Sequence, residues 1–584
     1  MTQTAAKPKP PSTRAPASGR KRPPRAFAFH YSRWGLLGAL LFFSASLVPS
    51  LMPRTGVAQG IISGITSVIG YGFATGFVAL WHYLGGHVPQ GTVRRWILSV
   101  VTLALAALLG LSVWKFVGWQ NDVREIFGVE PLSPTIWPTI LIVGAIIAYL
   151  LLALARGLRA LFRWAGDKFS AWLPRRLAVT LSTTVTLLVI WGLLSGAIVD
   201  GFFAVSNRMF STRDSGDKPL VVEPTSALKS GSPASLVKWD ELGRQGRDFI
   251  SRTTTVEQIN EVTGGGALEP IRVYVGLKSA DTVQGRADLL LEELKRTGAF
   301  DRKAILLCAT TGTGWLDPNA MDPVEFMFNG DSAIAGAQYS YLPSWISLFA
   351  DQQVVTDTSQ VVFQTIHDYW VTLPEGSRPE LYLFGLSLGS FGQEAVLGDV
   401  NMLNAPVDGA LLAGPPFLNP LHTELTDNRD PGSPAWNPWY GEGRTVRFTA
   451  KDDLLKRDEG LWGPDTRLAY LQHGSDGVVW FSPTLLYRSP DWLADGQRAP
   501  DVSDRVQWVP VVTFWQVAFD LALAGAAPDG YGHMYAVRDY TQAWAGVFNI
   551  PGWTDEDTDA VATYVQQRHD EFNARIAALK TEAN

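Results

Sequence analysis

The chain has very little cysteine, and residues 206–584, which are acidic overall, lack the pattern typical of nucleic-acid binding. Each absence excludes a class of function. Cys308 is the single cysteine in 584 residues, so no disulfide can form within the chain. It lies in the apolar run 304–308, where a buried small hydrophobic residue is a better interpretation than a catalytic thiol. No basic patch interleaved with aromatic residues occurs in the acidic part, which argues against nucleic-acid binding.

Acidic residues are also scarce in the first third of the chain. Residues 1–205 hold 19 Lys/Arg and 5 Asp/Glu, whereas residues 206–584 hold 30 and 50, giving net charges of +14 and −20. A basic, apolar segment before an acidic remainder indicates a membrane module followed by a soluble domain. Residues 1–33 contain no acidic residue and are rich in Pro, Ala, Ser and basic residues, so we predict a disordered tail.

Five apolar stretches follow the tail, each close to the length that crosses a bilayer. They lie at about residues 34–51, 56–84, 96–117, 136–154 and 177–199. Few ionisable residues lie deep inside them, so the usual sign of an ion or proton path is missing. The second stretch has an i+4 stripe of glycines that favours close helix packing: Gly56, Gly60, Gly64, Gly72 and Gly76. We therefore predict that residues 34–205 form a bundle of about five transmembrane helices that anchors the protein.

The distribution of basic residues predicts the orientation of this bundle. The tail carries eight Lys/Arg, Arg94 and Arg95 precede the third stretch, and six more basic residues lie between the fourth and fifth stretches. With five spans these segments share one side, which the positive-inside rule assigns to the cytoplasm. We predict a multi-pass cell-membrane protein with a cytoplasmic N-terminus and an extracytoplasmic C-terminal domain.

Beyond a linker over residues 206–265, strand-like and helix-like segments alternate. Strands are expected at residues 271–276, 304–309, 332–339, 381–386, 410–413 and 468–471, and helices at 287–296 and 354–371. This alternation predicts an α/β domain over residues 266–584, with a mostly parallel sheet covered by helices. Ligands of such sheets bind outside the carboxyl ends of the strands, so reactive residues are expected just after them.

The most informative motif is Gly385-x-Ser387-x-Gly389, which ends the strand-like run 381–386. A helix-like run over residues 390–397 follows, as in a nucleophile elbow that presents a serine hydroxyl above a sheet. The two glycines avoid collisions where strand and helix nearly touch. Ser387 is therefore the candidate nucleophile.

A serine nucleophile needs a histidine base and a carboxylate that orients it, in the chain order serine, acid, histidine. His533 lies in a glycine-flanked loop that could bring an imidazole to the serine, and we assign it as the base. Asp476 follows the strand 468–471 in the turn after His473, and we assign it as the acid. Asp452 and Asp453 are its main rivals.

The other downstream histidines fit the base less well. His422 has no strand before it, and His569 lies in a charged C-terminal helix where we expect it to be solvent-exposed. His473 stands at the end of the strand that supplies the acid.

The chemistry also needs donors for an oxyanion. The backbone N–H of Leu388, directly after the nucleophile, is one candidate, and the glycine-containing loop after residue 309 supplies others at Gly312 and Thr313. Gly312-x-Gly314 lacks the third glycine of a dinucleotide fingerprint. We predict no cofactor and no metal.

Seven sequence elements resemble one known family. They are SLVPSLMP (46–53), WDELGRQG (239–246), TGTGW (311–315), QYSYLPSW (338–345), FGLSLGS (384–390), VVTFWQ (511–516) and Gly532-His533. Together they resemble the bacterial membrane-anchored α/β-hydrolase family, which joins an N-terminal multi-span region to a catalytic domain. The resemblance implies an α/β-hydrolase fold and a serine hydrolase mechanism, and it names no substrate. No clear strand precedes His533, since residues 511–523 are typical of a helix.

The leading hypothesis is hydrolysis of a carboxylic ester, such as a lipid or envelope ester, through an acyl-enzyme. An acyltransferase could use the same triad, and a hydrolase-like domain could bind a ligand without catalysis. The intact set Ser387, Asp476 and His533 speaks against the last alternative. Residues 416–465 and 478–511 are rich in Trp and either form lids over the site or pack onto the core. The oligomeric state is not predicted.

Overall fold

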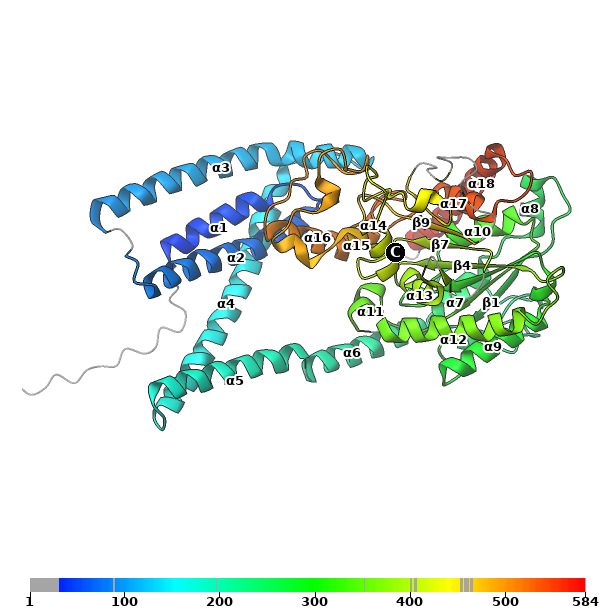
Figure 1. Cartoon of the computed structure of the whole chain (residues 1–584), viewed down its shortest axis with the longest axis horizontal. Helices are drawn as coiled ribbons and strands as arrows, with labels where there is room; N and C mark the ends of the chain where they lie inside the picture. The colour runs from blue at the N-terminus through cyan, green and yellow to red at the C-terminus, as the bar shows by residue number, and fades with distance from the viewer. Residues whose placement is uncertain are drawn as a thin grey trace, which may run out of the picture.

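The computed structural model describes residues 31–87, 90–195, 197–350, 352–399, 402–403, 407–451, 455, 462 and 466–582. Most of the predicted tail 1–33 lies outside these ranges. Long helices extend from one end of the molecule, and a sheet with helices on both sides forms the other end (Figure 1).

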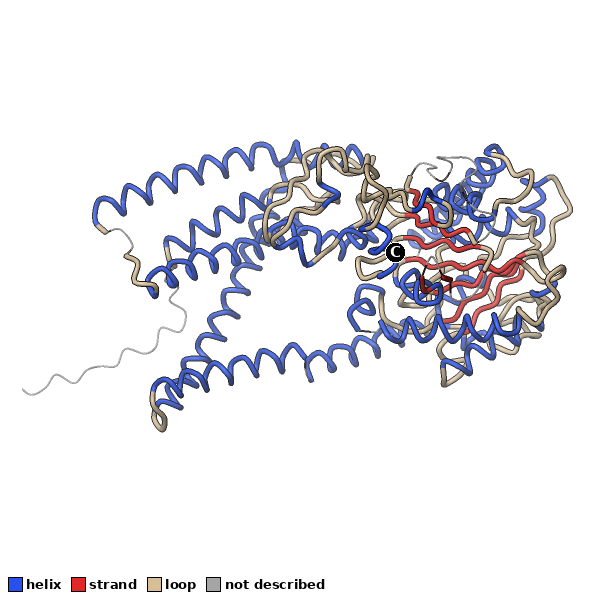
Figure 2. The backbone as a smooth tube through the Cα atoms, in the orientation of Figure 1, coloured by secondary structure: helices blue, strands red, loops and turns tan. Residues whose placement is uncertain are grey.

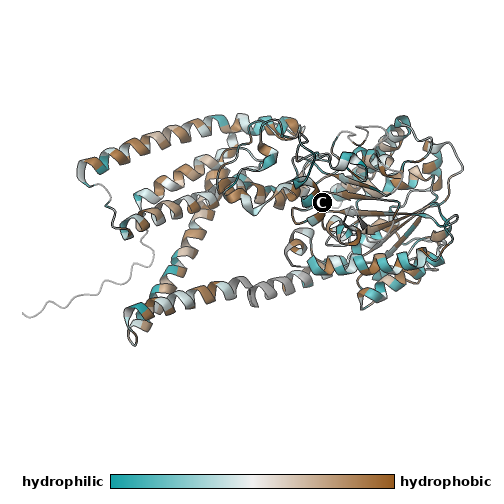
Figure 3. Cartoon of the chain, in the orientation of Figure 1, coloured by the Kyte–Doolittle hydropathy of each residue, from teal (hydrophilic) through white to brown (hydrophobic). Residues whose placement is uncertain are grey.

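Helices make up most of the described N-terminal part, and several of them are long and apolar. They are α1 (Arg33–Ser46), α2 (Gly56–Tyr83), α3 (Gly91–Ile126), α4 (Trp137–Ser170), α5 (Arg175–Ser195) and α6 (Ala197–Asp214). Among the described residues, three helices are long and apolar enough to cross a membrane: Gly56–Tyr83, Gly91–Ile126 and Pro134–Ser170. Apolar residues recur along their whole length (Figure 3). The number of spans and their orientation stay predictions.

Small residues let these helices approach closely. A Cβ atom on Gly64 would lie 2.8 Å from the Gly144 carbonyl oxygen of α4, and one on Gly60 would lie 2.8 Å from Val143. A Cβ atom on Gly72 or Gly76 would meet nothing within 4 Å. The predicted packing role therefore holds for the first half of the glycine stripe only.

A seven-stranded parallel sheet forms the centre of the C-terminal part (Figure 2). Its strands, in spatial order, are β1 (Ile271–Val275), β3 (Ser332–Ala337), β2 (Ala304–Ala309), β4 (Glu380–Leu386), β7 (Gly409–Ala413), β9 (Arg467–Leu471) and β8 (Val446–Thr449). All neighbouring strands pair in parallel. The six predicted strands are confirmed, whereas β8 and the small antiparallel pair β5 (Gly398–Asp399) and β6 (Met402–Leu403) were not predicted.

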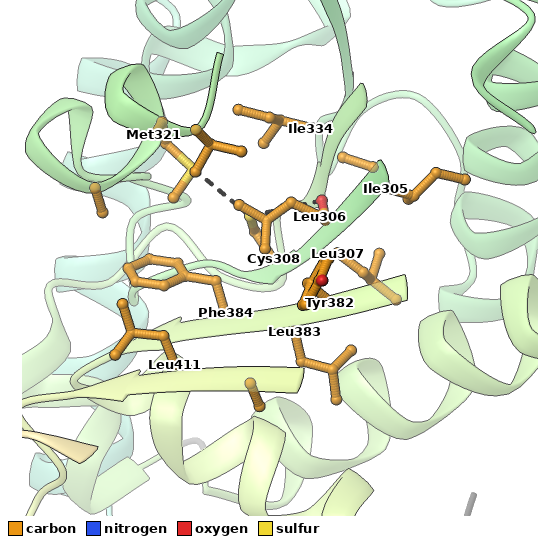
Figure 4. Packing of buried hydrophobic residues seen from close by; sticks show 14 of the residues in the cluster. Ile305, Leu306, Leu307, Cys308, Met321, Ile334, Tyr382, Leu383, Phe384 and Leu411 are labelled. Atoms are coloured by element: carbon orange, nitrogen blue, oxygen red, sulfur yellow. Dashed lines mark hydrogen bonds between the residues drawn. The ribbon is translucent and has the colours of Figure 1, made fainter. Parts of the chain in front are cut away.

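Helices cover both faces of the sheet and bury the strands almost completely. α12 (Gln352–Trp370) contacts both α9 (Val283–Arg296) and α13 (Leu388–Leu397). A second group of helices contact one another: α10 (Pro318–Met327), α17 (Val537–Phe548) and α18 (Asp555–Glu582). Cys308 lies in this core, where its Sγ atom is 3.6 Å from Met321 Sδ (Figure 4). The interpretation of Cys308 as a buried hydrophobic residue is therefore right, and burial raises the pKa of its thiol.

The remaining helices are short. They are α7 (Gly243–Ser251), α8 (Val256–Thr263), α11 (Ser344–Ala350), α14 (Pro420–Asp427), α15 (Gly477–Trp480) and α16 (Val512–Leu523), with 3-10 turns η1 (Pro134–Ile136), η2 (Trp239–Glu241), η3 (Ala299–Asp301), η4 (Gly441–Gly443), η5 (Pro483–Leu486), η6 (Asp491–Leu493) and η7 (Ala524–Ala526). The predicted linker, residues 206–265, contributes to the core. Val237, Leu242 and Phe249 belong to the main hydrophobic cluster, so this segment packs onto the sheet domain.

The expected exposure of His569 is wrong. Its Nε2 atom lies 2.8 Å from Asp322 Oδ2 and its Nδ1 atom lies 2.9 Å from Asn319 Oδ1. Asp322 also forms a buried ion pair of 2.7 Å with Arg272 of β1. The histidine is buried because its helix, α18, packs against α10, which carries both of its partners.

The tryptophans of the two candidate lid segments pack inside the protein. Trp436, Trp480, Trp492 and Trp508 form a second hydrophobic cluster with Val517 of α16 and with Leu51 of the N-terminal part. For these four residues the packing interpretation is confirmed, and a lid role of the two segments stays a hypothesis.

A buried carboxyl group should make stability depend on pH. Asp317 caps α10, accepting from Asn319 N–H at 3.0 Å and from the Tyr540 hydroxyl at 3.2 Å. Burial raises the pKa of Asp317 to about 7, whereas an aspartate in an unfolded chain titrates near about 4. The folded protein keeps this proton while the unfolded chain loses it, so the contribution of Asp317 to stability falls as the pH rises from about 4 to about 7.

Asp317→Asn keeps the cap and removes the titration. We expect the variant to lose less stability than wild type between about pH 4.5 and pH 7.5, as measured by denaturant unfolding in detergent. Asp504→Asn, at a side chain that is 97% exposed, is the control and should follow wild type. Equal losses in Asp317→Asn and wild type would contradict the prediction.

Candidate active site

Ser387 sits on a strained turn between β4 and α13. Its backbone adopts φ 57° and ψ −125°, a conformation that non-glycine residues rarely take. A Cβ atom on Gly385 would overlap the Gly389 carbonyl group, and one on Gly389 would overlap the Ala309 carbonyl oxygen. Only glycine fits at both positions, so the GxSxG spacing is a steric requirement of this turn.

Hydrogen bonds hold the strained residue in place. Ser387 N–H donates to the Ala413 carbonyl of β7 at 2.9 Å. The Ser390 hydroxyl and the Ser390 N–H donate to the Ser387 carbonyl at 2.7 Å and 2.8 Å. The turn is thus fixed both to the neighbouring strand and to its own helix.

Asp476 is a fully buried carboxylate just beyond β9. Its Oδ1 atom accepts from Val478 N–H at 2.8 Å, and its Oδ2 atom lies 2.6 Å from His533 Nδ1 and accepts from the Tyr535 hydroxyl at 2.8 Å. Burial acts to raise the pKa of Asp476, but the charge of His533 and these hydrogen bonds outweigh it and hold the pKa below its ordinary value. An ionised carboxylate only accepts, so Nδ1 of His533 carries the hydrogen.

His533 lies on the loop after η7, which is bonded to the loop that carries Asp476. Gly532 N–H donates to Ser475 Oγ at 3.0 Å, and His473 Nδ1 lies 2.9 Å from the Gly532 carbonyl oxygen. Because that carbonyl accepts from His473, the second histidine supports the loop of the first. His533 Nε2 is buried and has no hydrogen-bond partner among the described residues.

Ser387 and His533 line one apolar cavity of about 240 Å³. Its other lining residues are Ser344, Leu348, Leu388, Val478, Leu521, Ala522, Ala524 and Gly525. The structure thus brings the three predicted triad residues together at the carboxyl edge of the sheet. A larger hollow of about 870 Å³ lies at the amino ends of the strands, where it is lined by Lys303, Glu380 and Arg467 among others. None of the three triad residues lines this hollow.

The predicted oxyanion donors differ in position. Leu388, at the start of α13, lines the cavity, and no hydrogen-bond acceptor for its N–H is found among the described residues. Gly312 and Thr313 are not among the cavity-lining residues, and Gly312 N–H donates to Ser344 Oγ at 3.2 Å. Ser344 of α11, which was not predicted as a site residue, lines the cavity and accepts this hydrogen bond.

The remaining candidates are accounted for as follows. His422 is buried, and its Nε2 atom lies 2.6 Å from Gln472 Oε1. The rival acids Asp452 and Asp453 lie outside the described residues. In the described part of the chain, no three His, Cys, Asp or Glu side chains gather as a metal ion would require. The sequence did not predict Tyr535 as a partner of Asp476. Its position two residues after His533 is the signal that could have indicated it.

Comparisons with known proteins point to one family. A family model described as "Alpha/beta-hydrolase family" matches residues 271–561, and one described as "Alpha/beta-hydrolase family N-terminus" matches residues 47–253. A solved structure described as an iodinated complex of acetyl xylan esterase is similar over 30% of this chain and 83% of its own, at 14% identity and a TM-score of 0.19. A likeness at that level supports no inference about this chain. No curated protein matches it.

The hydroxyl of Tyr535 should matter for the reactivity of Ser387. Tyr535→Phe removes one of the three donors to Asp476. We expect the rate at which a fluorophosphonate reacts with Ser387 to fall about tenfold, the equivalent of one hydrogen bond to a charged group.

Tyr382→Phe is the matched control, because Tyr382 also donates to a carboxylate, Glu380, at 3.1 Å, but at the opposite edge of the sheet. It should react like wild type. A Tyr535→Phe rate equal to that of wild type would show that Tyr535 does not support Asp476.

Proposed function

Since the chain belongs to the alpha/beta-hydrolase family, we propose that it is a membrane-anchored serine hydrolase that cleaves a carboxylic ester. Ser387 is the nucleophile, His533 the base and Asp476 the acid. The observation that carries this proposal is the 2.6 Å contact between His533 Nδ1 and Asp476 Oδ2, with Ser387 in the same cavity as His533.

The geometry accounts for each step of such a reaction. Asp476 fixes the tautomer in which Nδ1 carries the hydrogen, so Nε2 is left to accept the proton of Ser387 as its oxygen attacks the ester carbonyl. The oxyanion that forms accepts a hydrogen bond from Leu388 N–H. His533 then gives the proton to the leaving alcohol, and water releases the acyl group by the same route.

The residues that line the cavity favour a substrate with an apolar acyl group. Leu348, Val478 and Leu521 line the space next to Ser387, and no Asp, Glu, Lys or Arg is among the described residues that line it. An apolar pocket with a few convergent polar groups suits a substrate whose reacting carbonyl is joined to a hydrocarbon chain.

The long apolar helices support a membrane location for this enzyme. We propose five crossings, a cytoplasmic N-terminus and an extracytoplasmic catalytic domain. The end of α1, the start of α2 and the end of α3 all lie on the side that faces the sheet domain (Figure 1). There Leu51 donates a hydrogen bond to Asp520 of α16, and Phe127 stacks on Tyr531. The beginning of α1 lies at the opposite end, which agrees with an odd number of crossings.

Fluorophosphonate labelling tests the chemistry. We expect purified wild type to be labelled and Ser387→Ala to lose the label, since the reagent forms a bond only with an activated serine. Ser377→Ala, at an exposed loop serine, should be labelled like wild type. Folded wild-type protein that takes no label would overturn the proposal. Product analysis with and without an added alcohol separates a hydrolase from an acyltransferase.

Reporter fusions test the orientation. An enzyme that is active only outside the cytoplasm, fused after Asn584, should be active, and the same reporter fused after Gly86 in a truncated chain should be inactive. Inactivity after Asn584, together with fluorescence of a reporter that folds only in the cytoplasm, would reverse the proposed topology.

A further inference from the structure

Helix α16 buries three polar side chains and leaves apolar ones exposed at its C-terminal end. Thr513, Gln516 and Asp520 are buried, together with Val512 and Val517. Leu523 is 39% exposed, and Ala522 and, in η7, Ala526 are exposed beside it. The exposed side chains of a surface helix in a soluble protein are mostly polar, so the exposed end of α16 fits an apolar environment.

The polar side of α16 binds the loop between the first two membrane helices. Gln516 Nε2 donates to the Val48 carbonyl at 2.7 Å, and Leu51 N–H donates to Asp520 Oδ2 at 3.0 Å. Arg54 of the same loop is buried and attracts Asp520. These contacts fix α16 against the point where the chain turns between α1 and α2.

That turn marks one surface of the membrane. α2, which is long and apolar enough to cross a bilayer, begins at Gly56, two residues after Arg54. Phe127, directly after α3, stacks on Tyr531 at 4.7 Å between ring centroids, and Met52 packs with Ala524 in the same hydrophobic cluster. The ends of two spans therefore reach both α16 and the loop of His533.

A third side of α16 forms a wall of the reaction cavity. Leu521 and Ala522 of α16, with Ala524 and Gly525 of η7, line the space next to Ser387 and His533. Ala522 is both exposed and part of this lining. The apolar outer side of the helix is thus continuous with the cavity.

We propose that α16 is an interfacial helix lying in the surface of the bilayer, and that the substrate is an ester lipid of that bilayer whose acyl chain enters the cavity past α16. The inference rests on the proposed function and names its substrate class. An amphipathic helix with its apolar side in the headgroup region fits the exposure of Leu523. Entry from the side spares the acyl chain any passage through water.

Hydrolysis of such a lipid ester needs no reactant other than water. The ester C–O bond breaks as Ser387 Oγ takes the acyl group, and His533 transfers the serine proton to the leaving alcohol. Water then attacks the acyl carbon, the bond from that carbon to Ser387 Oγ breaks, and His533 passes a proton of the water to Oγ as a fatty acid leaves. Tyr487, which is 72% exposed, directly follows η5, an element that contacts α16, and exposed aromatic rings of this kind are common at membrane interfaces.

The position of α16 can be measured without any catalysis. The full-length Ser387→Ala protein carrying L523C is labelled with a nitroxide and reconstituted into phosphatidylcholine–phosphatidylglycerol vesicles. Cys308 is 3% exposed and should not label, which wild type verifies. L579C is the matched control, because Leu579 is a helical leucine of α18 with 42% exposure.

We expect oxygen dissolved in the lipid to relax the label at 523 more strongly than a water-soluble nickel chelate does, and the reverse at 579. A label at 523 that is as accessible to nickel as the label at 579 would overturn the interfacial position. This result is independent of whether the protein is an esterase.

The route is tested by two substrates. Rates are measured for a fluorogenic diacyl phospholipid in the vesicles and for water-soluble p-nitrophenyl butyrate. We expect L523Q to lower the ratio of lipid to soluble turnover by about fivefold or more, because a polar side chain weakens insertion. L579Q should leave the ratio unchanged, and L523A is the milder variant should L523Q fail to fold.

Each result decides one claim. An unchanged ratio in folded L523Q, or wild type that cleaves the soluble ester but no vesicle lipid, would overturn the lipid route. Wild type that takes no fluorophosphonate and cleaves neither ester would overturn the proposed function and, with it, the substrate class. The nitroxide result would then still decide where α16 lies.

Discussion

Burial of the Arg54 guanidinium is the constraint on which the joint between the two parts of the protein depends. A buried charge without partners is costly by several kcal/mol. Here Nη1 donates to the Ser46 carbonyl at 3.0 Å and to Gln59 Oε1 at 2.8 Å, while Asp520 supplies the opposite charge. Asp520 belongs to α16, and the next two residues of this helix, Leu521 and Ala522, line the cavity that Ser387 and His533 also line. The hydrogen bond from Leu51 N–H to Asp520 Oδ2, at 3.0 Å, ties the loop of Arg54 to this helix and so sets the position of one wall of that cavity.

The central features of the fold were predictable because their causes are local. Buried parallel strands are nearly continuous apolar runs, and the family match and the seven-stranded sheet confirm the predicted α/β-hydrolase fold. The spacing of Gly385, Ser387 and Gly389 reflects a clash between backbone atoms within one turn. β8 escaped prediction because its four residues include Arg447, which interrupts the apolar pattern.

What the sequence did not yield depends on partners far away in the chain. Burial of His569 follows from its contact with Asp322, 247 positions earlier. The Gly312 N–H, an expected oxyanion donor, is engaged by Ser344, 32 positions later, and Tyr535 reaches Asp476 across 59 positions. Ser387 and Asp476 could be named as candidates from turns that follow strands, and His533 from its glycine-flanked loop, but the groups that support them come from tertiary packing.

The contact between Leu51 and Asp520 joins residues 469 positions apart, which has a consequence for biosynthesis. The loop around Arg54 is synthesised early, whereas α16 leaves the ribosome only after most of the C-terminal domain. Until then, the polar groups of that loop lack the partners that they have in the finished protein. In the proposed topology, the first helices to enter the membrane are therefore among the last to complete their native contacts, and a fragment ending before α16 lacks part of the contacts of its own N-terminal helices.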